Sequence, residues 1–158
     1  MSWRSLILLG AGLLSMQAWS EGFPKGCEPR DYQFSHQHLI LNETGQQRLF
    51  VIYNHTSFPV RIQRYQTQSF FMGPSLSVNL GAGEWSAFAT DLRQMQLECR
   101  MPKGEQTYRV DCGQYLAVCE YPRAKFPVSN MGNYWVAANK PQREVINEAA
   151  AKGIYLHW

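Results

Sequence analysis

The sequence predicts a mainly β protein, an antiparallel β-sandwich or small barrel with one C-terminal helix, a final strand after it, and two disulfides. Between residues 31 and 128, short apolar stretches alternate with turn residues and show no helical period. Helical spacing of apolar residues occurs only after residue 139. Four cysteines follow an N-terminus of the kind that directs export, and exported thiols are usually oxidised.

Residues 1–20 have the pattern of a secretory signal peptide. Arg4 precedes the apolar run Leu6–Leu14, and Ala18 and Ser20 supply the small residues found before a cleavage site. The run is much shorter than the ~20 residues that cross a bilayer. We therefore expect residues 21–158 to form a single disulfide-stabilised β-rich domain that is periplasmic or secreted.

Neither a membrane anchor nor nucleic-acid binding is indicated. Cys27 follows Phe23–Gly26, which is not the segment that precedes a lipid-modified cysteine. The formal net charge of +3 falls by one when Arg4 is removed, and the basic residues are spread along the chain rather than gathered in a stripe. We expect a product without a lipid anchor and no nucleic acid among its partners.

The apolar stretches predict strands with an alternation of buried and exposed side chains. The expected strands are 37–41, 48–53, 60–65, 75–80, 85–89, 92–99, 107–112, 115–121 and 134–137. The first two are expected to form a hairpin, and Gly81–Gly83 predicts a hairpin turn between 75–80 and 85–89. In the third strand, Val60, Ile62 and Tyr65 are expected to share one face, with the intervening polar residues toward water.

The helix follows the last of these strands. Asn139 is the expected N-cap, and Pro141 is tolerated in the first turn because its missing N–H has no partner there. The helix is expected to run to Lys152 and to stop at Gly153. Ile154–Trp158 is then expected to pair with the sheet as a final strand, because its aromatic side chains would otherwise stay exposed.

The cysteines are expected to form two disulfides, which spacing alone leaves with three possible connectivities. Cys99 and Cys112 flank a turn-rich segment, so a hairpin would bring them together. That pairing leaves Cys27 to bond with Cys119 and to tie the amino end to a central strand. A zinc or redox role is disfavoured because both usually use a Cys-x-x-Cys pair, with two residues between the cysteines, and no such pair is present.

Metal binding by histidines and nucleophilic catalysis have weak support in the sequence. His36 and His38 would project from the same face of a strand and could share a metal with His55 or His157, but no acidic ligand is nearby and surface histidines are the favoured interpretation. The chain has no Gly-x-Ser-x-Gly elbow and no free cysteine once two bridges form. We therefore expect no enzyme activity, no catalytic residues and no cofactor.

Aromatic residues are too numerous for one core of this size, so some are expected at the surface. Phe70, Phe71 and Met72, which precede Gly73-Pro74, form the best candidate for an exposed interaction patch. Asn42-Glu43-Thr44 and Asn54-His55-Thr56 also match the acceptor pattern for N-glycosylation, which matters only in a eukaryotic secretory pathway.

Several stretches together resemble the enhanced-entry protein B (EnhB) family of Legionella and related gammaproteobacteria. They are residues 24–28, 39–45, 84–89 and 133–137, together with the series Cys99, Cys112 and Cys119. The resemblance implies a periplasmic or exported non-enzymatic protein linked to host-cell entry. It also implies companion proteins that include a Sel1-repeat protein and a transpeptidase-like protein. That family has no established catalytic residues to transfer to this chain.

The favoured hypothesis is a non-enzymatic interaction module of the bacterial cell envelope, whose partners are envelope proteins and, by the resemblance, a Sel1-repeat protein. Its aromatic patch or a sheet edge would contact the partner. The alternative is a periplasmic carrier of a small ligand or metal, held in the sandwich or by the histidine pair.

Overall fold

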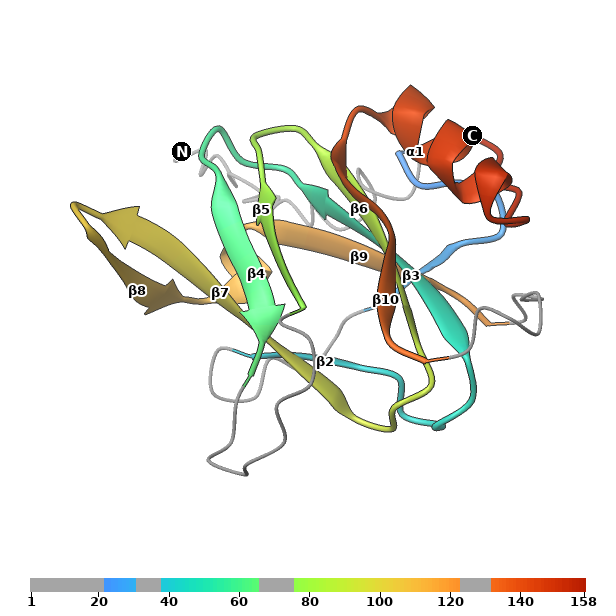
Figure 1. The fold of residues 1–158 in the computed structure, drawn as a ribbon, viewed down its shortest axis with the longest axis horizontal. Helices are drawn as coiled ribbons and strands as arrows, with labels where there is room; N and C mark the ends of the chain where they lie inside the picture. Colours follow the sequence, from blue (N-terminus) through green and yellow to red (C-terminus); the bar gives the residue numbers. More distant parts are fainter. Residues whose placement is uncertain (1–21, 31–37, 66–75, 123–131) are drawn as a thin grey trace, which may run out of the picture.

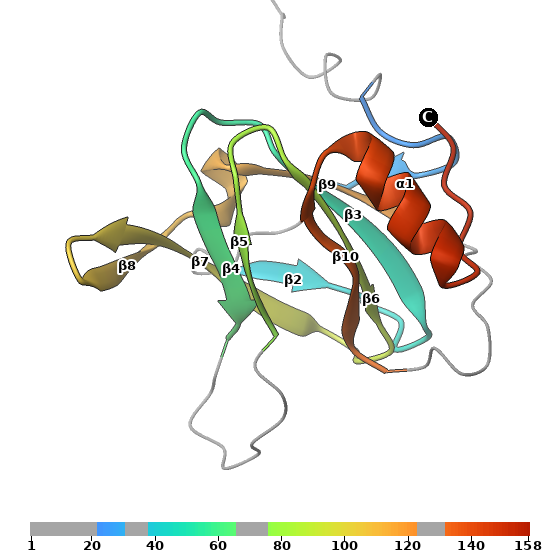
Figure 2. The ribbon, with the colours of Figure 1, turned by 45° about the horizontal axis from the view of Figure 1, so that its top comes forward.

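The computed structural model describes residues 22–30, 38–65, 76–122 and 132–158. These residues form two antiparallel sheets that face each other as a sandwich, and one helix lies outside the first sheet (Figure 1, Figure 2). The mainly β fold class is confirmed. The signal peptide over residues 1–20 and the patch of Phe70, Phe71 and Met72 lie outside the described residues.

The two sheets divide the strands in an order that the sequence does not reveal. Sheet 1 has the order β1 (Glu28–Pro29), β9 (Leu116–Tyr121), β3 (Arg48–Asn54), β6 (Trp85–Thr90) and β10 (Tyr134–Lys140). Sheet 2 has the order β2 (Leu39–Leu41), β7 (Met95–Lys103), β4 (Val60–Arg64) and β5 (Ser77–Leu80), with β8 (Gln106–Val110) paired to β7. The helix α1 spans Gln142–Ala151, and a short 3₁₀ turn spans Cys112–Gln114.

The central strands of sheet 1, β3 and β6, are buried on both faces. Phe50 and Phe88 point between the sheets and pack with side chains of sheet 2. Their neighbours Leu49 and Ala87 point the other way and pack with Val145 and the rest of the inner side of α1. This double burial explains why β3 is a continuous apolar run, since a strand with both faces covered has no polar face to alternate with.

Two predicted hairpins are wrong. β2 belongs to sheet 2 and β3 to sheet 1, so these consecutive strands do not pair. The turn Gly81–Gly83 likewise carries the chain from β5 in sheet 2 to β6 in sheet 1. The alternating pattern reports which residues are buried, and both sheets bury residues in the same core, so the pattern cannot identify the neighbouring strand.

The hairpin between β7 and β8 is real, and its free end projects from the body of the molecule (Figure 1). Only Gly104 and Glu105 lie between the two strands, and Gly104 has φ 62°. A tight two-residue turn of this kind needs positive φ, which glycine adopts without strain. The turn sets the register, so that Arg100 lies opposite Arg109.

The helix ends as expected but begins differently. Gly153 has φ 77° and follows the last turn, and the N–H groups of Gly153 and Ile154 donate to the carbonyls of Ala150 and Ala149. The N-cap is Pro141 rather than Asn139. Asn139 instead binds the turn that follows β5, where its Oδ1 accepts a hydrogen bond from the Gly81 N–H at 2.8 Å.

The predicted final strand is wrong, although its residues are held in place. Ile154–Trp158 is not paired as a strand, and its buried side chains Ile154 and Leu156 pack beneath α1 in the outer core of sheet 1. The Lys25 N–H donates to the His157 carbonyl at 2.6 Å. The expected burial of the aromatic side chains is only partly met, because Trp158 is half-buried whereas Tyr155 is 73% exposed.

Two buried asparagines join the sheets to each other. Asn42, which follows β2 in sheet 2, donates from Nδ2 to the Thr90 carbonyl of β6 in sheet 1 at 3.0 Å. Asn54, at the end of β3 in sheet 1, donates to the Leu80 carbonyl of β5 in sheet 2 at 3.1 Å and to the Phe58 carbonyl at 2.7 Å. Each Oδ1 also accepts from the N–H and hydroxyl of the threonine two positions later.

Candidate functional site

Both predicted disulfides are present. The N-terminal disulfide joins Cys27 to Cys119 with a Cα–Cα distance of 5.5 Å, and the hairpin disulfide joins Cys99 to Cys112 with a distance of 5.3 Å. The first lies in the outer core between sheet 1 and α1, and the second lies in the core between the sheets. All four cysteines are bonded, so the sulfur atoms brace the fold and no thiol remains for catalysis or metal binding.

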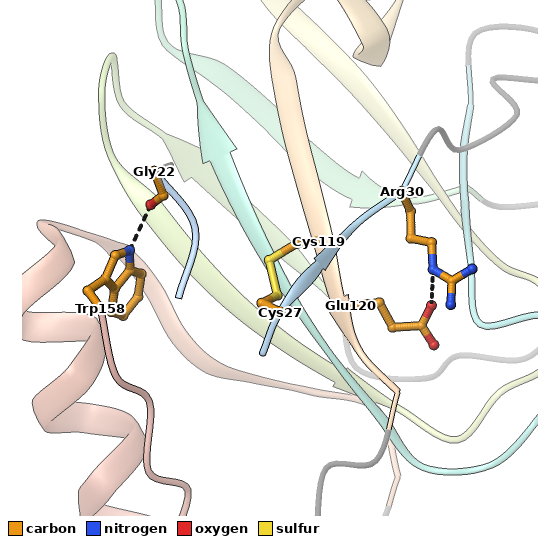
Figure 3. Close-up of a disulfide and its surroundings, with 6 residues drawn as sticks. All are labelled: Gly22, Cys27, Arg30, Cys119, Glu120 and Trp158. Atoms are coloured by element: carbon orange, nitrogen blue, oxygen red, sulfur yellow. Dashed lines mark hydrogen bonds and ion pairs between the residues drawn. A yellow bond between two sulfur atoms is a disulfide. The ribbon is translucent and has the colours of Figure 1, made fainter. Parts of the chain in front are cut away.

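The N-terminal segment is held at further points beside its disulfide (Figure 3). Arg30 Nε lies 3.3 Å from Glu120 Oε2, and Trp158 Nε1 donates to the Gly22 carbonyl at 2.8 Å. Arg48 forms a second ion pair with Glu120 at 3.5 Å. Opposite charges are matched around this segment, which is typical of a structural role.

Burial raises the pKa of Tyr121, the last residue of β9, to about 12. Its hydroxyl is buried and has no hydrogen-bond partner among the described residues, so the charged phenolate is disfavoured. Between pH 10 and 12 the unfolded chain releases this proton while the folded chain keeps it. We therefore expect stability to fall as the pH rises through this window.

Denaturant unfolding at a series of pH values between 10 and 12 measures this loss of stability. Tyr121→Phe is expected to lose less stability than the wild type over the same pH window. Tyr155→Phe is the matched control, because Tyr155 is 73% exposed. An identical pH dependence in Tyr121→Phe and the wild type would show that another group is responsible.

The histidines are not brought together as a ligand set in the described part of the chain. His36 lies outside the described residues, and His38 is buried with its ring centroid 3.8 Å from that of Tyr65. Among the described residues, no group of three His, Cys, Asp or Glu side chains could hold a metal ion.

Three arginines lie side by side on the outer face of sheet 2. Arg61 of β4 pairs with Arg100 of β7, and Arg100 pairs with Arg109 of β8. Directly paired residues of antiparallel strands project from the same face, so the three side chains cross the sheet in one line. We call Arg61, Arg100 and Arg109 the arginine row. Like charges directly opposite each other destabilise a sheet, which makes this arrangement unusual.

One buried carboxylate partly balances the arginine row. Glu98 is 4% exposed, and its Oε1 accepts from Gln63 Nε2 at 2.5 Å and from Arg100 Nη1 at 3.3 Å. Its Oε2 lies 3.0 Å from Arg109 Nη2. Arg100 also donates from Nε and Nη2 to the hydroxyl and carbonyl of Thr107. These bonds hold Arg100 in a single orientation.

Tyr65 completes the cluster from the next position on the outer face. The Arg109 guanidinium carbon lies 5.3 Å from the centroid of its ring, within the range of a cation–π contact. The ring also contacts the imidazole of His38, with centroids 3.8 Å apart. The expectation that Tyr65 shares the inner face of Val60 and Ile62 is therefore wrong, because this ring covers polar side chains rather than the core.

The accessible part of the arginine row is at its two ends. Arg61 is exposed and forms no salt bridge with any described residue. The Arg109 side chain is 39% exposed despite its pairing with Glu98. The arrangement therefore presents two reachable guanidinium groups on either side of a fixed one, and it can bind anionic groups through charge-assisted hydrogen bonds.

Sequence reasoning missed the arginine row because its members come from three strands. The two-residue turn at Gly104 could have placed Arg100 opposite Arg109, since a tight hairpin pairs residues symmetrically about its turn. Arg61 had no such signal. Its place in the row depends on the pairing of β4 with β7, which are not consecutive strands.

The two N-glycosylation patterns have a structural role. Asn42 is 3% exposed and Asn54 is fully buried, and both Nδ2 atoms donate to backbone carbonyls. Neither side chain can carry a glycan in this fold.

Comparison of the chain with protein-family models, with curated proteins and with solved structures gives no match. In the part of the chain that the structure describes, no helix is both long and apolar enough to cross a membrane.

Proposed function

We propose that this protein is an exported, non-enzymatic interaction module of the bacterial cell envelope, periplasmic or secreted. The observation that carries the proposal is the use of all four cysteines in two disulfides, one in each core. Disulfides persist in oxidising compartments and are rare in the cytosol. The apolar run at Leu6–Leu14, with its small residues downstream, supports the same compartment.

The surface most suited to a partner is the outer face of sheet 2. Helix α1 covers the outer face of sheet 1, and the residues beneath it are buried. Arg61 and its strand neighbour Asn79 are both exposed on the corresponding face of sheet 2. Phe70, Phe71 and Met72, which lie outside the described residues, remain a predicted second contact.

Cell fractionation with thiol trapping tests the compartment. The full-length chain is expressed in a bacterium, and the periplasmic and secreted fractions are alkylated before and after reduction. We expect a product that lacks residues 1–20 and whose four cysteines react only after reduction. A cytoplasmic product with reactive thiols would contradict the proposal.

Photocrosslinking in cells tests the interaction. A photoreactive residue at Asn79 on β5 is expected to give a discrete adduct with an envelope protein, whereas one at Arg143 on the exposed side of α1 serves as the matched control. Equal labelling from both positions, or none from Asn79, would count against an interaction through sheet 2. Native mass spectrometry that finds a small bound mass instead would favour the carrier.

A further inference from the structure

The arginine row carries more positive charge than the carboxylates paired with it neutralise. Its three guanidinium groups have a single carboxylate, Glu98, as their ion-pair partner among the described residues. The N-terminal segment differs, because there Arg30 and Arg48 are matched by Glu28 and Glu120. Two directly opposed like-charge pairs cost stability, so stability alone does not account for the row.

We propose that the arginine row binds an acidic segment of a partner polypeptide through its carboxylates. This inference rests on the proposed function and specifies the chemistry of the partner. Arg100 is oriented by Glu98 and Thr107 before any ligand arrives, which lowers the entropy lost on binding. Arg61 and the exposed part of Arg109 then supply the new contacts.

The width of the row favours several carboxylates on one chain over a single small anion. Arg61 and Arg109 are separated by the strand that carries Arg100, so their backbones lie about 10 Å apart at the usual spacing of strands. One carboxylate cannot form bidentate contacts with both ends. Acidic side chains on the same face of an extended peptide recur about every 7 Å, so two successive ones fit within the distance between Arg61 and Arg109.

The surroundings favour a polypeptide over a lipid surface. Two neighbours of the row are polar: Asn79 is paired with Arg61, and Thr107 accepts hydrogen bonds from Arg100. The described large apolar side chains that are exposed are Phe58, Leu92, Tyr108 and Tyr155, and Tyr108, next to Arg109 on β8, points to the opposite face of the strand. A membrane-binding face would be expected to add apolar side chains that insert below the headgroups.

Fluorescence anisotropy with a labelled oligoglutamate peptide tests the inference on the mature, oxidised protein at low salt. We expect binding that weakens as the ionic strength rises, and no binding of oligoglutamine. Arg61→Gln is expected to weaken binding by about three- to tenfold, and Arg61→Glu by more. Arg143→Gln removes the same charge from the exposed side of α1 and is expected to leave the affinity unchanged.

Competition with inorganic phosphate and binding to anionic vesicles distinguish an acidic polypeptide from other anionic ligands. Inorganic phosphate that displaces the peptide at low concentration, or vesicles of anionic phosphatidylglycerol that bind better than the peptide, would overturn the assignment to acidic polypeptides. Equal weakening by Arg61→Gln and Arg143→Gln would overturn the assignment to the row. If the crosslinked adduct at Asn79 persists in Arg61→Gln, the proposed function stands and this inference fails. If the wild type is not exported, the proposed function itself fails.

Discussion

Replacement of Cys27 and Cys119 together by serine is expected to lower the free energy of unfolding by about 4.5 kcal/mol. The bond joins residues 92 positions apart, and a cross-link that closes so long a loop removes much conformational entropy from the unfolded chain. Urea unfolding of the oxidised wild type and of the double variant measures the difference. An effect of this size is a large share of the stability of a typical domain.

The hairpin disulfide provides the internal comparison. Cys99 and Cys112 are separated by 13 positions, so their double serine variant is expected to lose about 3 kcal/mol. Arg30→Gln tests the ion pair beside the N-terminal disulfide and is expected to cost less than about 1 kcal/mol, because Arg30 is half exposed. A smaller loss in the Cys27 and Cys119 variant than in the hairpin variant would contradict the loop-entropy explanation.

Asn54→Ala is expected to destabilise the protein by about 3 kcal/mol. The substitution removes two donations from Nδ2, to the carbonyls of Leu80 and Phe58, and leaves buried backbone groups without partners. It also removes an acceptor for the N–H and hydroxyl of Thr56. Because Asn54 joins sheet 1 to sheet 2, the loss should appear as a lower urea midpoint of the single cooperative transition.

Asn79→Ala is the matched control, since Asn79 is exposed on β5 and its loss is expected to cost less than about 0.5 kcal/mol. Asn54→Asp keeps the shape of the side chain but directs a carboxylate oxygen at a carbonyl, so it should be at least as harmful as Asn54→Ala. Similar stabilities of Asn54→Ala and Asn79→Ala would mean that the buried asparagine does not hold the sheets together.

The local features of the fold could be predicted wherever neighbours along the chain decide them. Gly153 ends α1 because the last turn needs a residue with positive φ, and the hairpin disulfide forms because a short turn brings Cys99 near Cys112. Asn139 illustrates the limit. Its side chain could serve as a helix cap, but a distant backbone N–H, that of Gly81, takes the same oxygen.

The arginine row and its carboxylate Glu98 could not be predicted from neighbours along the chain. Charged residues on strands were expected to face water, and Arg61 does. Glu98 is buried despite its charge because two arginines and Gln63 surround it. No spacing along the chain marks this group, since its members meet only after β4, β7 and β8 have paired.

The amino-acid sequence by itself determined the strand-rich class, the helix near the C-terminus, and the cysteine content that two disulfides require, because each depends on residue types and short-range periodicity. Only the tertiary structure decided which sheet each strand joins and that three arginines stand in one row. Both depend on pairing between segments far apart in the chain, and the alternation of buried and exposed residues is the same for every possible partner strand.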